Sequence, residues 1–313
     1  MENNKKIPLV VICGPTASGK TALSLSLARY FDAEIVSADS MQVYKDMNIG
    51  TAKVTKEEAQ GIKHYLIDVV SPDERYTVSN FNKDALEAIE KILAEGKTPI
   101  VVGGTGLYID SLIYGIEYQE MKFDEDYREY LMKKAESPIG LKELYDEAMK
   151  IDPEAMKKIF FNDKKRITRV LEIYKATGKT KTELEKLSRA KGVKYDYKIF
   201  AISRDREELY DRINRRVDIM IKDGLIDEVK NIYSKYQKFP TAMQGLGYKE
   251  VVEYLNKEIT YNEMVDKIKK ETRRYAKRQL TWFRKTEGLI WLDANDPLES
   301  NIQIIINEYN KGE

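Results

Sequence analysis

The sequence predicts an α/β protein: a parallel sheet flanked by helices, with an all-helical insertion. Two observations support this fold class. Strand and helix patterns alternate over residues 1–121, and the strand pattern then vanishes until about residue 198. Strands that alternate with helices form parallel sheets covered on both faces. We therefore expect a discontinuous core from residues 1–121 and 198–313, interrupted by a helical domain at 122–197.

The individual elements follow from hydrophobic periodicity and from helix stop signals. Short apolar runs predict strands at 8–13, 34–37, 65–69, 99–102, 197–202 and 289–292. Three- and four-residue spacing predicts helices of the core at 20–31, 80–95, 205–223 and 260–285, and helices of the insertion at 124–136, 140–149 and 163–176. Gly96, Gly178 and Gly224 follow three of these helices, as is typical of helix ends.

Composition describes an ordinary soluble protein. Of 313 residues, 42% are hydrophobic and 34% are charged. Cys13 is the only cysteine and cannot form an internal disulfide, so we expect a reducing compartment and a packed rather than catalytic thiol. The apolar run before residue 14 is too short for a signal peptide or a membrane span. We expect a cytoplasmic protein without a membrane partner, and a monomer, because no interface pattern is visible.

A complete phosphate-loop motif, G-x-x-x-x-G-K-T, lies between the first strand and the first helix. Its residues are Gly14, Pro15, Thr16, Ala17, Ser18, Gly19, Lys20 and Thr21. Backbone N–H groups of such a loop surround an anion, and the following helix directs its positive end to the same point. Lys20 adds a charge, and the Thr21 hydroxyl is placed to hold Mg²⁺ on bound phosphates. A glycine-rich turn that binds nothing is disfavoured by the flanking strand and helix. The motif thus predicts a P-loop NTPase-like core that binds a di- or triphosphate.

Asp39 follows strand 34–37, at the edge of the sheet where ligands bind in this fold class. From its position alone it can cap the next helix, hold Mg²⁺ through water, or act in catalysis. Strand 99–102 ends in Gly103-Gly104-Thr105-Gly106, and the paired glycines would let a ligand approach the backbone closely. An acidic residue directly after an apolar strand, which NTP-hydrolysing proteins use, is not evident. These features favour group transfer over hydrolysis.

The segment 267–285 carries nine basic residues and one acidic residue in a chain of net charge +1. On the predicted helix most of its basic residues lie outside the apolar stripe, so we favour contact with a polyanion such as nucleic acid over a merely solvated face. Three other signals are weaker. His64, the only histidine, predicts a surface or strand-edge role and no zinc site. One arginine of 212–216 can reach a phosphate or remain at the surface, and Trp282 can stack on a base, although packing is favoured.

Several stretches together resemble the tRNA dimethylallyltransferase (tRNA isopentenyltransferase) family. They are residues 14–21, 39–44, 48–53, 64–68, 102–108, 162–166, 245–250 and 276–284, in order along nearly the whole chain. Gly245 departs from the alanine more common in the family. The family transfers a dimethylallyl group from its diphosphate to N6 of the adenosine 3′ to the anticodon. The resemblance thus implies dimethylallyl diphosphate and the tRNA anticodon stem-loop as substrates, with Mg²⁺ as cofactor.

The resemblance also implies roles for individual residues. Asp39 corresponds to the general base, while Lys20, Thr21 and Arg216 would stabilise the departing pyrophosphate. The residues that would contact tRNA are Asp39, Ser40, Met41, Gln42, Thr105, Arg128, Asp163, Lys164, Lys165, Arg166 and Ile167, with Arg274, Lys277 and Arg278 of the basic helix on phosphates. The helical insertion would close over the tRNA loop.

Two other classes of function remain to be weighed. An adenylate isopentenyltransferase or a small-molecule kinase could use the same phosphate loop, but neither needs a helical insertion and a basic helix. An RNA-binding protein that uses nucleotide only as a switch would need the acidic Mg²⁺ partner that the sequence lacks. Both are less favoured than tRNA prenylation.

Overall fold

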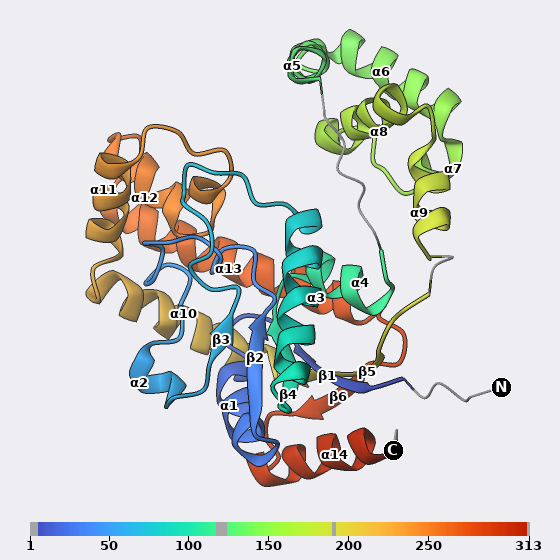
Figure 1. Cartoon of the computed structure of the whole chain (residues 1–313). Helices are drawn as coiled ribbons and strands as arrows, with labels where there is room; N and C mark the ends of the chain where they lie inside the picture. The colour runs from blue at the N-terminus through green and yellow to red at the C-terminus, as the bar shows by residue number, and fades with distance from the viewer. Residues whose placement is uncertain (1–5, 117–123, 190–191, 312–313) are drawn as a thin grey trace, which may run out of the picture. The chain divides into compact units, whose positions relative to one another are not determined.

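The structure is a computed structural model that describes residues 6–116, 124–189 and 192–311 (Figure 1). The chain forms two compact units, one from Met1–Ile113 with Lys194–Glu313 and one from Tyr114–Val193. The second unit begins and ends a few residues before the insertion expected at 122–197. Its end is earlier because Asp196 already pairs with Pro8 in the sheet of the first unit.

The first unit contains a six-stranded sheet in the order β3-β2-β4-β1-β5-β6, and every adjacent pair is parallel. The strands are β1 (Pro8–Cys13), β2 (Ala33–Ser37), β3 (His64–Tyr65), β4 (Thr98–Gly103), β5 (Asp196–Ser203) and β6 (Ile290–Asp293). The predicted α/β class with a parallel sheet is confirmed. The strand expected at 65–69 is wrong in length, because Leu66 and Asp68 adopt φ of +61° and +57° and end the extended conformation.

Helices cover both faces of this sheet (Figure 1). On one face α1 (Lys20–Tyr30) and α14 (Leu298–Asn310) pack against β1, and they share a core with Ile12 and Phe200. On the other face α3 (Val78–Ala94) packs against β2, β4 and α4 (Gly106–Ile113). Capping boxes at Thr55, at the start of α2 (Lys56–Ala59), and at Thr77, at the start of α3, give hydrogen-bond partners to N–H groups that helix starts leave unpaired.

A second layer of helices packs beside the carboxyl ends of the strands. It comprises α10 (Arg206–Lys222), α11 (Leu225–Lys235), the 3₁₀ turn η1 (Ala242–Gln244), α12 (Tyr248–Leu255) and α13 (Tyr261–Phe283). These elements share a buried core with Val43 and Met47, from the loop after β2. The helices predicted at 205–223 and 260–285 are confirmed as α10 and α13, whereas α11, α12 and α14 were not assigned from the sequence.

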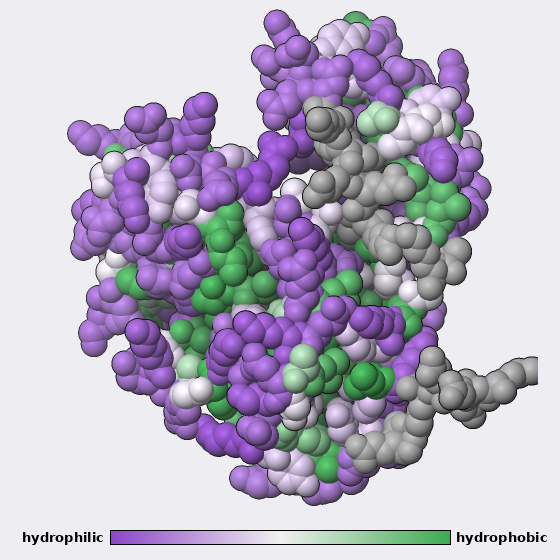
Figure 2. Space-filling view, viewed as in Figure 1, coloured by the Kyte–Doolittle hydropathy of each residue, from purple (hydrophilic) through white to green (hydrophobic). Residues whose placement is uncertain are grey.

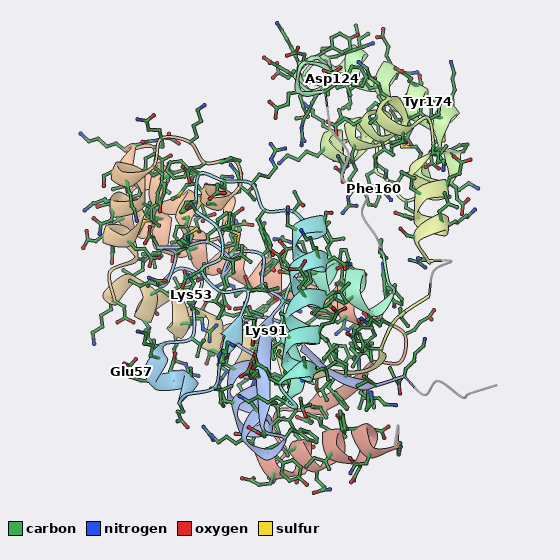
Figure 3. The ribbon with its side chains drawn as sticks, viewed as in Figure 1. Lys53, Glu57, Lys91, Asp124, Phe160 and Tyr174 are labelled. Carbon is green, nitrogen blue, oxygen red and sulfur yellow. The ribbon has the colours of Figure 1, made fainter. Side chains whose placement is uncertain are left out.

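The second unit is entirely helical in its described residues. It contains α5 (Glu125–Lys134), α6 (Pro138–Ile151), α7 (Pro153–Met156), α8 (Lys164–Thr177) and α9 (Lys181–Arg189) around its own core, which includes Leu131, Leu144 and Leu171. Asp124, labelled in Figure 3, caps α5 through a 2.9 Å bond from the Tyr127 N–H. Gly178, in the left-handed conformation at φ +67°, ends α8. The unit therefore has a hydrophobic core independent of the sheet.

In the view of Figure 2, hydrophilic side chains predominate over the outer helices, and hydrophobic side chains appear in separate patches between them. Within the described part of the chain, no helix combines the length and apolar character needed to cross a membrane.

Candidate active site

A cavity of about 760 Å³ lies in the first unit, beyond the carboxyl ends of β1, β2 and β4. This is the edge at which parallel α/β sheets bind ligands. Its lining includes residues 16–21 of the phosphate loop, 39–42 after β2, 50–52, Gly103 and Gly104 after β4, Arg212, Arg216, Tyr248, Tyr275, Arg278 and Gln279. The structure therefore brings the predicted phosphate loop and Asp39 into one cavity.

The phosphate loop has the backbone that its glycines predict. Gly14 and Gly19 adopt φ of +135° and +109°, and Gly19 is the N-cap of α1. The Lys20 ammonium donates to the carbonyls of Gly14 (3.0 Å) and Pro15 (2.7 Å). Burial lowers the pKa of Lys20 from 10.5 to about 8; Arg216 lowers it further, and Asp39 opposes the shift. A bound anion would compensate this buried charge.

Three arginines hold the same loop from outside. Arg212 Nε donates to the Ala17 carbonyl at 2.9 Å, and Arg216 Nη1 lies 3.5 Å from Thr16 Oγ1. Burial, followed by the charge of Arg212, lowers the pKa of Arg216. Arg204, which the sequence analysis did not single out, donates to the Ser18 carbonyl at 3.4 Å. Arg212 and Arg216 are partly buried and line the cavity, whereas Arg215 is exposed. Two of the three arginines at 212–216 therefore belong to the phosphate site.

Asp39 lines the cavity and also holds the turn that follows β2. Its Oδ1 accepts hydrogen bonds from the N–H groups of Met41 (2.9 Å) and Gln42 (3.3 Å). Of the roles considered for Asp39, capping is therefore observed, but Asp39 caps the turn after β2 and not a helix. Among hydrogen bonds between described residues, none reaches Asp39 Oδ2. One oxygen is therefore structural, and the other is available to a ligand.

The ends of β2 and β4 are joined beside Asp39. Thr105 Oγ1 accepts a hydrogen bond from the Ser40 N–H (3.0 Å), and the Thr105 N–H donates to the Ala38 carbonyl (3.2 Å). At Gly103 a Cβ atom would lie 2.1 Å from the Ala38 carbonyl oxygen, so only glycine permits this approach. These interactions fix Asp39 relative to β4.

Gln279 on α13 is a site residue to which the sequence analysis gave no role. Its side chain is 6% exposed; Oε1 accepts from the Thr16 N–H (2.9 Å) and Nε2 donates to the Gly104 carbonyl (2.8 Å). A Cβ at Gly104 would lie 2.3 Å from Nε2. Both glycines line the cavity, as close approach of a ligand to their backbone requires, and they also allow Ala38 and Gln279 to pack against β4. Gln279 lies in the stretch 276–284 that carries the family resemblance, but its partner Thr16 is 263 residues away, so the residue pattern alone does not indicate this role.

The part of the cavity lining formed by residues 50–52 depends on Glu228 of α11, a second residue that the sequence analysis missed. Its carboxylate accepts from the N–H groups of residues 48 (2.8 Å), 49 (2.7 Å) and 50 (3.1 Å) and from the Tyr248 hydroxyl (2.5 Å). Gln42 binds the next carbonyls, Thr51 (3.2 Å) and Ala52 (3.4 Å). Lys53, labelled in Figure 3, donates to Asp68 at 2.6 Å. The two hydrogen bonds of Gln42 to Thr51 and Ala52 mean that its side-chain amide is already engaged within the protein.

The residues predicted to contact tRNA fall on both units. Ser40, Met41, Gln42 and Arg278 line the cavity, and Arg274 and Lys277 are exposed on α13. Arg128 lies on α5; Asp163 caps α8, which begins with Lys164, Lys165 and Arg166. Ile167 is 0% exposed, so its side chain belongs to the core of the second unit rather than to its surface.

The charge of α13 is less free than its sequence indicates. Lys267 pairs with Glu253, Lys269 pairs with Asp218 (2.6 Å), and Arg274 pairs with Glu271 (2.6 Å). The expectation of few acidic partners is wrong for these positions, because two of the partners come from α10 and α12. Lys277 and Arg278 make no ion pair with any residue in the described ranges. Both are exposed, and Arg278 also lines the cavity.

The weaker sequence signals also have clear positions. Cys13 is fully buried and its pKa is raised by burial to about 12, which confirms a packed thiol. His64 lies in the edge strand β3, as expected. The Trp282 ring packs over Gly106, and its Nε1 donates to Asp110 at 3.0 Å. No group of three or more His, Cys, Asp or Glu side chains suited to a metal is found in the described part of the chain.

Comparisons with known proteins agree with this geometry. The family model described as IPP transferase matches residues 42–286. The chain is 50% identical over 294 residues to the tRNA dimethylallyltransferase of Thermoanaerobacter sp. (strain X514), covering 93% of each chain, and 48% identical to that of Acetivibrio thermocellus, covering 96% and 95%.

Solved structures give the same result. The full-length tRNA isopentenylpyrophosphate transferase of Bacillus halodurans matches with a TM-score of 0.73 and 41% identity, over 98% of this chain and 97% of that one. A eukaryotic dimethylallyltransferase crystallised acting on tRNA matches with a TM-score of 0.81 and 32% identity, over 98% of this chain and 80% of that one. The chain belongs to the IPP transferase family.

Proposed function

We propose that the protein transfers a dimethylallyl group from dimethylallyl diphosphate to N6 of the adenosine 3′ to the anticodon of tRNA, giving N6-isopentenyladenosine. One observation carries the proposal: a lysine-bearing phosphate loop and a carboxylate line the same cavity in a chain half identical to tRNA dimethylallyltransferases. The phosphate loop suits the leaving group, and the carboxylate suits the nucleophile.

The donor's diphosphate would bind in the loop of residues 14–21. Lys20, Arg216 and the loop N–H groups surround the position where negative charge develops as the allylic C–O bond breaks, so they would stabilise the departing pyrophosphate. Thr21 is exposed at the start of α1 and lines the cavity, and one hydroxyl together with diphosphate oxygens suits Mg²⁺. Mg²⁺ bound there would neutralise charge on the leaving group.

The acceptor amine would lie at Asp39 Oδ2. As the N6–C1 bond forms and the C1–O bond of the donor breaks, the proton of N6 passes to the Asp39 carboxylate and pyrophosphate leaves. The same carboxylate selects adenine, because guanine and uracil present a carbonyl oxygen at the corresponding position and two acceptors repel. The other oxygen, Oδ1, keeps its bonds to Met41 and Gln42 and fixes the side chain.

The acceptor base must leave the anticodon loop to enter such a cavity, as it does in other base-modifying enzymes. We propose that residues 122–197 act as a tRNA-contacting domain and that the enzyme acts as a monomer. The exposed cations of α13 and α8 would hold phosphates of the stem-loop. An adenylate isopentenyltransferase or a small-molecule kinase remains the alternative.

The proposed reaction is tested by mass spectrometry of nucleosides. Purified protein, dimethylallyl diphosphate, Mg²⁺ and unmodified tRNA are expected to give N6-isopentenyladenosine at the position 3′ to the anticodon. Free AMP and ATP in place of tRNA serve as the controls. Label on free adenylate would support the adenylate transferase, and phosphate transfer from ATP without prenylation would support the kinase.

The cations of α13 provide a second prediction. Replacing Arg274, Lys277 and Arg278 by glutamate is expected to weaken tRNA binding. The slope of log affinity against log salt should fall by about 0.7–0.9 for each RNA phosphate that the helix no longer neutralises. Lys91→Glu, a single charge reversal on α3, is the control for the effect of each reversal. Binding is measured by fluorescence anisotropy at several salt concentrations. An unchanged slope would contradict phosphate binding by this helix.

A further inference from the structure

Glu228 of α11 anchors residues 48–52, the wall segment, whose last three residues line the cavity. Its Oε2 accepts from the first two N–H groups of the wall segment, at 2.8 and 2.7 Å. Its Oε1 accepts from the third N–H (3.1 Å) and from the Tyr248 hydroxyl (2.5 Å). Burial and then the Glu228 charge raise the pKa of Tyr248, so its hydroxyl stays protonated and can donate. Four donors from two separate parts of the chain therefore converge on one carboxylate.

Tyr248 can approach Glu228 because position 50 is a glycine. A Cβ atom at Gly50 would lie 2.4 Å from a carbon of the Tyr248 ring, which is closer than side-chain atoms approach one another. The ring is fully buried in the core that Tyr248 shares with residues of α11, so close packing leaves it no room to move aside. The wall segment, Tyr248 and Glu228 thus form one fitted unit.

Helix α11 holds the loop after β2 at other points as well. Lys235, about two helical turns after Glu228, donates to Asp46 at 2.6 Å. Between these two positions Val229 is buried in the same core as Met47. The helix is therefore already attached to the loop by packing and by an ion pair. The bonds of Glu228 are directed instead to the part of the loop that lines the cavity.

Gln42 connects the wall segment to Asp39. Its Nε2 donates to the carbonyls of Thr51 (3.2 Å) and Ala52 (3.4 Å), which directly follow the residues held by Glu228. The N–H of the same glutamine donates to Asp39 Oδ1 at 3.3 Å. A continuous series of bonds therefore runs from Glu228 through the wall segment and Gln42 to the carboxylate in the cavity.

We infer that Glu228 is a positioning residue: by holding the wall segment it keeps Gln42, and through it the Asp39 carboxylate, in the orientation that accepts the N6 proton. A carboxylate suits this task, because hydrogen bonds to a charged acceptor are stronger than those to a neutral one. The orientation matters because a displacement of about 1 Å at a reacting group can cost about 10²-fold in rate. The inference rests on the proposed function, in which Asp39 is the base.

The first test separates the rate of the reaction from RNA binding. Glu228→Gln keeps the shape of the side chain, but it removes the charge and brings an NH₂ donor against N–H donors. We expect kcat for tRNA prenylation to fall roughly ten- to a hundredfold under single-turnover conditions. The Kd for tRNA and its salt dependence should stay the same, because the cations proposed to hold RNA phosphates lie on other elements.

The control for this test is the neighbouring carboxylate of α11. Asp227 is exposed and pairs with Lys230 at 3.1 Å, so Asp227→Asn makes the same chemical change without touching the wall segment. It should react like the unaltered protein. Full activity in Glu228→Gln, or an equal loss in Asp227→Asn, would overturn the inference.

The second test combines Glu228→Gln with Asp39→Asn. If Glu228 acts through Asp39, its replacement should cost nothing further once the base is absent. We expect the kcat of the double variant to match that of Asp39→Asn within about twofold, since the effects of coupled residues are not additive. A further loss as large as the one measured with Asp39 present would assign Glu228 a role independent of the base, which contradicts the inference.

The third test measures amide hydrogen exchange in the full chain and needs no reaction. In Glu228→Gln, exchange should become faster in residues 41–52, while β1 exchanges as slowly as in the unaltered protein. Equal acceleration in both regions, together with a lower melting temperature, would indicate general destabilisation and would overturn the inference. Nucleoside analysis of the unaltered protein tests the proposed function separately. If that analysis finds no product, the exchange experiment still tests the anchor, so the two failures are distinguishable.

Discussion

Replacing Asp39 by asparagine is expected to lower kcat for tRNA prenylation by about 10²–10⁴-fold, the usual contribution of a general base. Asparagine keeps an oxygen for the N–H groups of Met41 and Gln42, so the turn after β2 should persist. Only the ability to accept the N6 proton is removed. Single-turnover rates with saturating tRNA and donor measure this effect, and tRNA affinity should stay largely intact.

Asp39→Ala is the matched comparison, because it removes both the base and the bonds to the turn. Its rate should fall at least as far as that of Asp39→Asn, and its melting temperature should fall as well, since two backbone N–H groups lose their acceptor. If Asp39→Asn reacts at close to the normal rate while Asp39→Ala does not, the aspartate supports the turn and does not act as a base.

The fold was predictable wherever its causes are local. The segment from Pro8 to Tyr30 matches its predicted strand, loop and helix almost residue for residue, because the motif places Gly14 and Gly19 at two positions of positive φ. The length of the edge strand β3 was overestimated, because no local motif indicates where this strand ends. Its apolar run continues, but Leu66 turns into the left-handed region, and no propensity scale anticipates that for a leucine.

Only those residues of the candidate site that belong to a motif or follow a strand were predictable from the sequence. Lys20 was found from the phosphate-loop motif and Asp39 from its position after a strand, and the sheet brings the ends of its strands together. Gln279 and Glu228 were missed because their partners lie 263 and 180 residues away, and neither residue type is unusual on a helix. The charge of α13 was overestimated for a related reason, since a count along one helix cannot include acidic residues supplied by its neighbours.

Replacing Lys20 by methionine is expected to lower kcat by about 10²–10³-fold, as when one preorganised charge at a developing anion is removed. Methionine keeps the length of the side chain without the ammonium. Because burial already disfavours the charged form of Lys20, the variant should unfold at no lower a temperature than the parent. Rapid-quench kinetics and calorimetry together separate loss of catalysis from loss of folding. An unchanged rate would contradict the assignment of the phosphate loop to the leaving group.

The pH dependence of kcat/KM for the donor gives this lysine its own signature. The profile reports groups of the free enzyme, in which the pKa of Lys20 is about 8 rather than 10.5. Below that pH the ammonium is present and attracts the diphosphate. As pH rises through about 8 the charge is lost, so kcat/KM should fall toward tenfold per pH unit. Lys20→Arg stays protonated over this range. Its profile should therefore remain flat from pH 8 to 10 even if its absolute rate is lower, and a parallel decline in both proteins would assign the titration to another group.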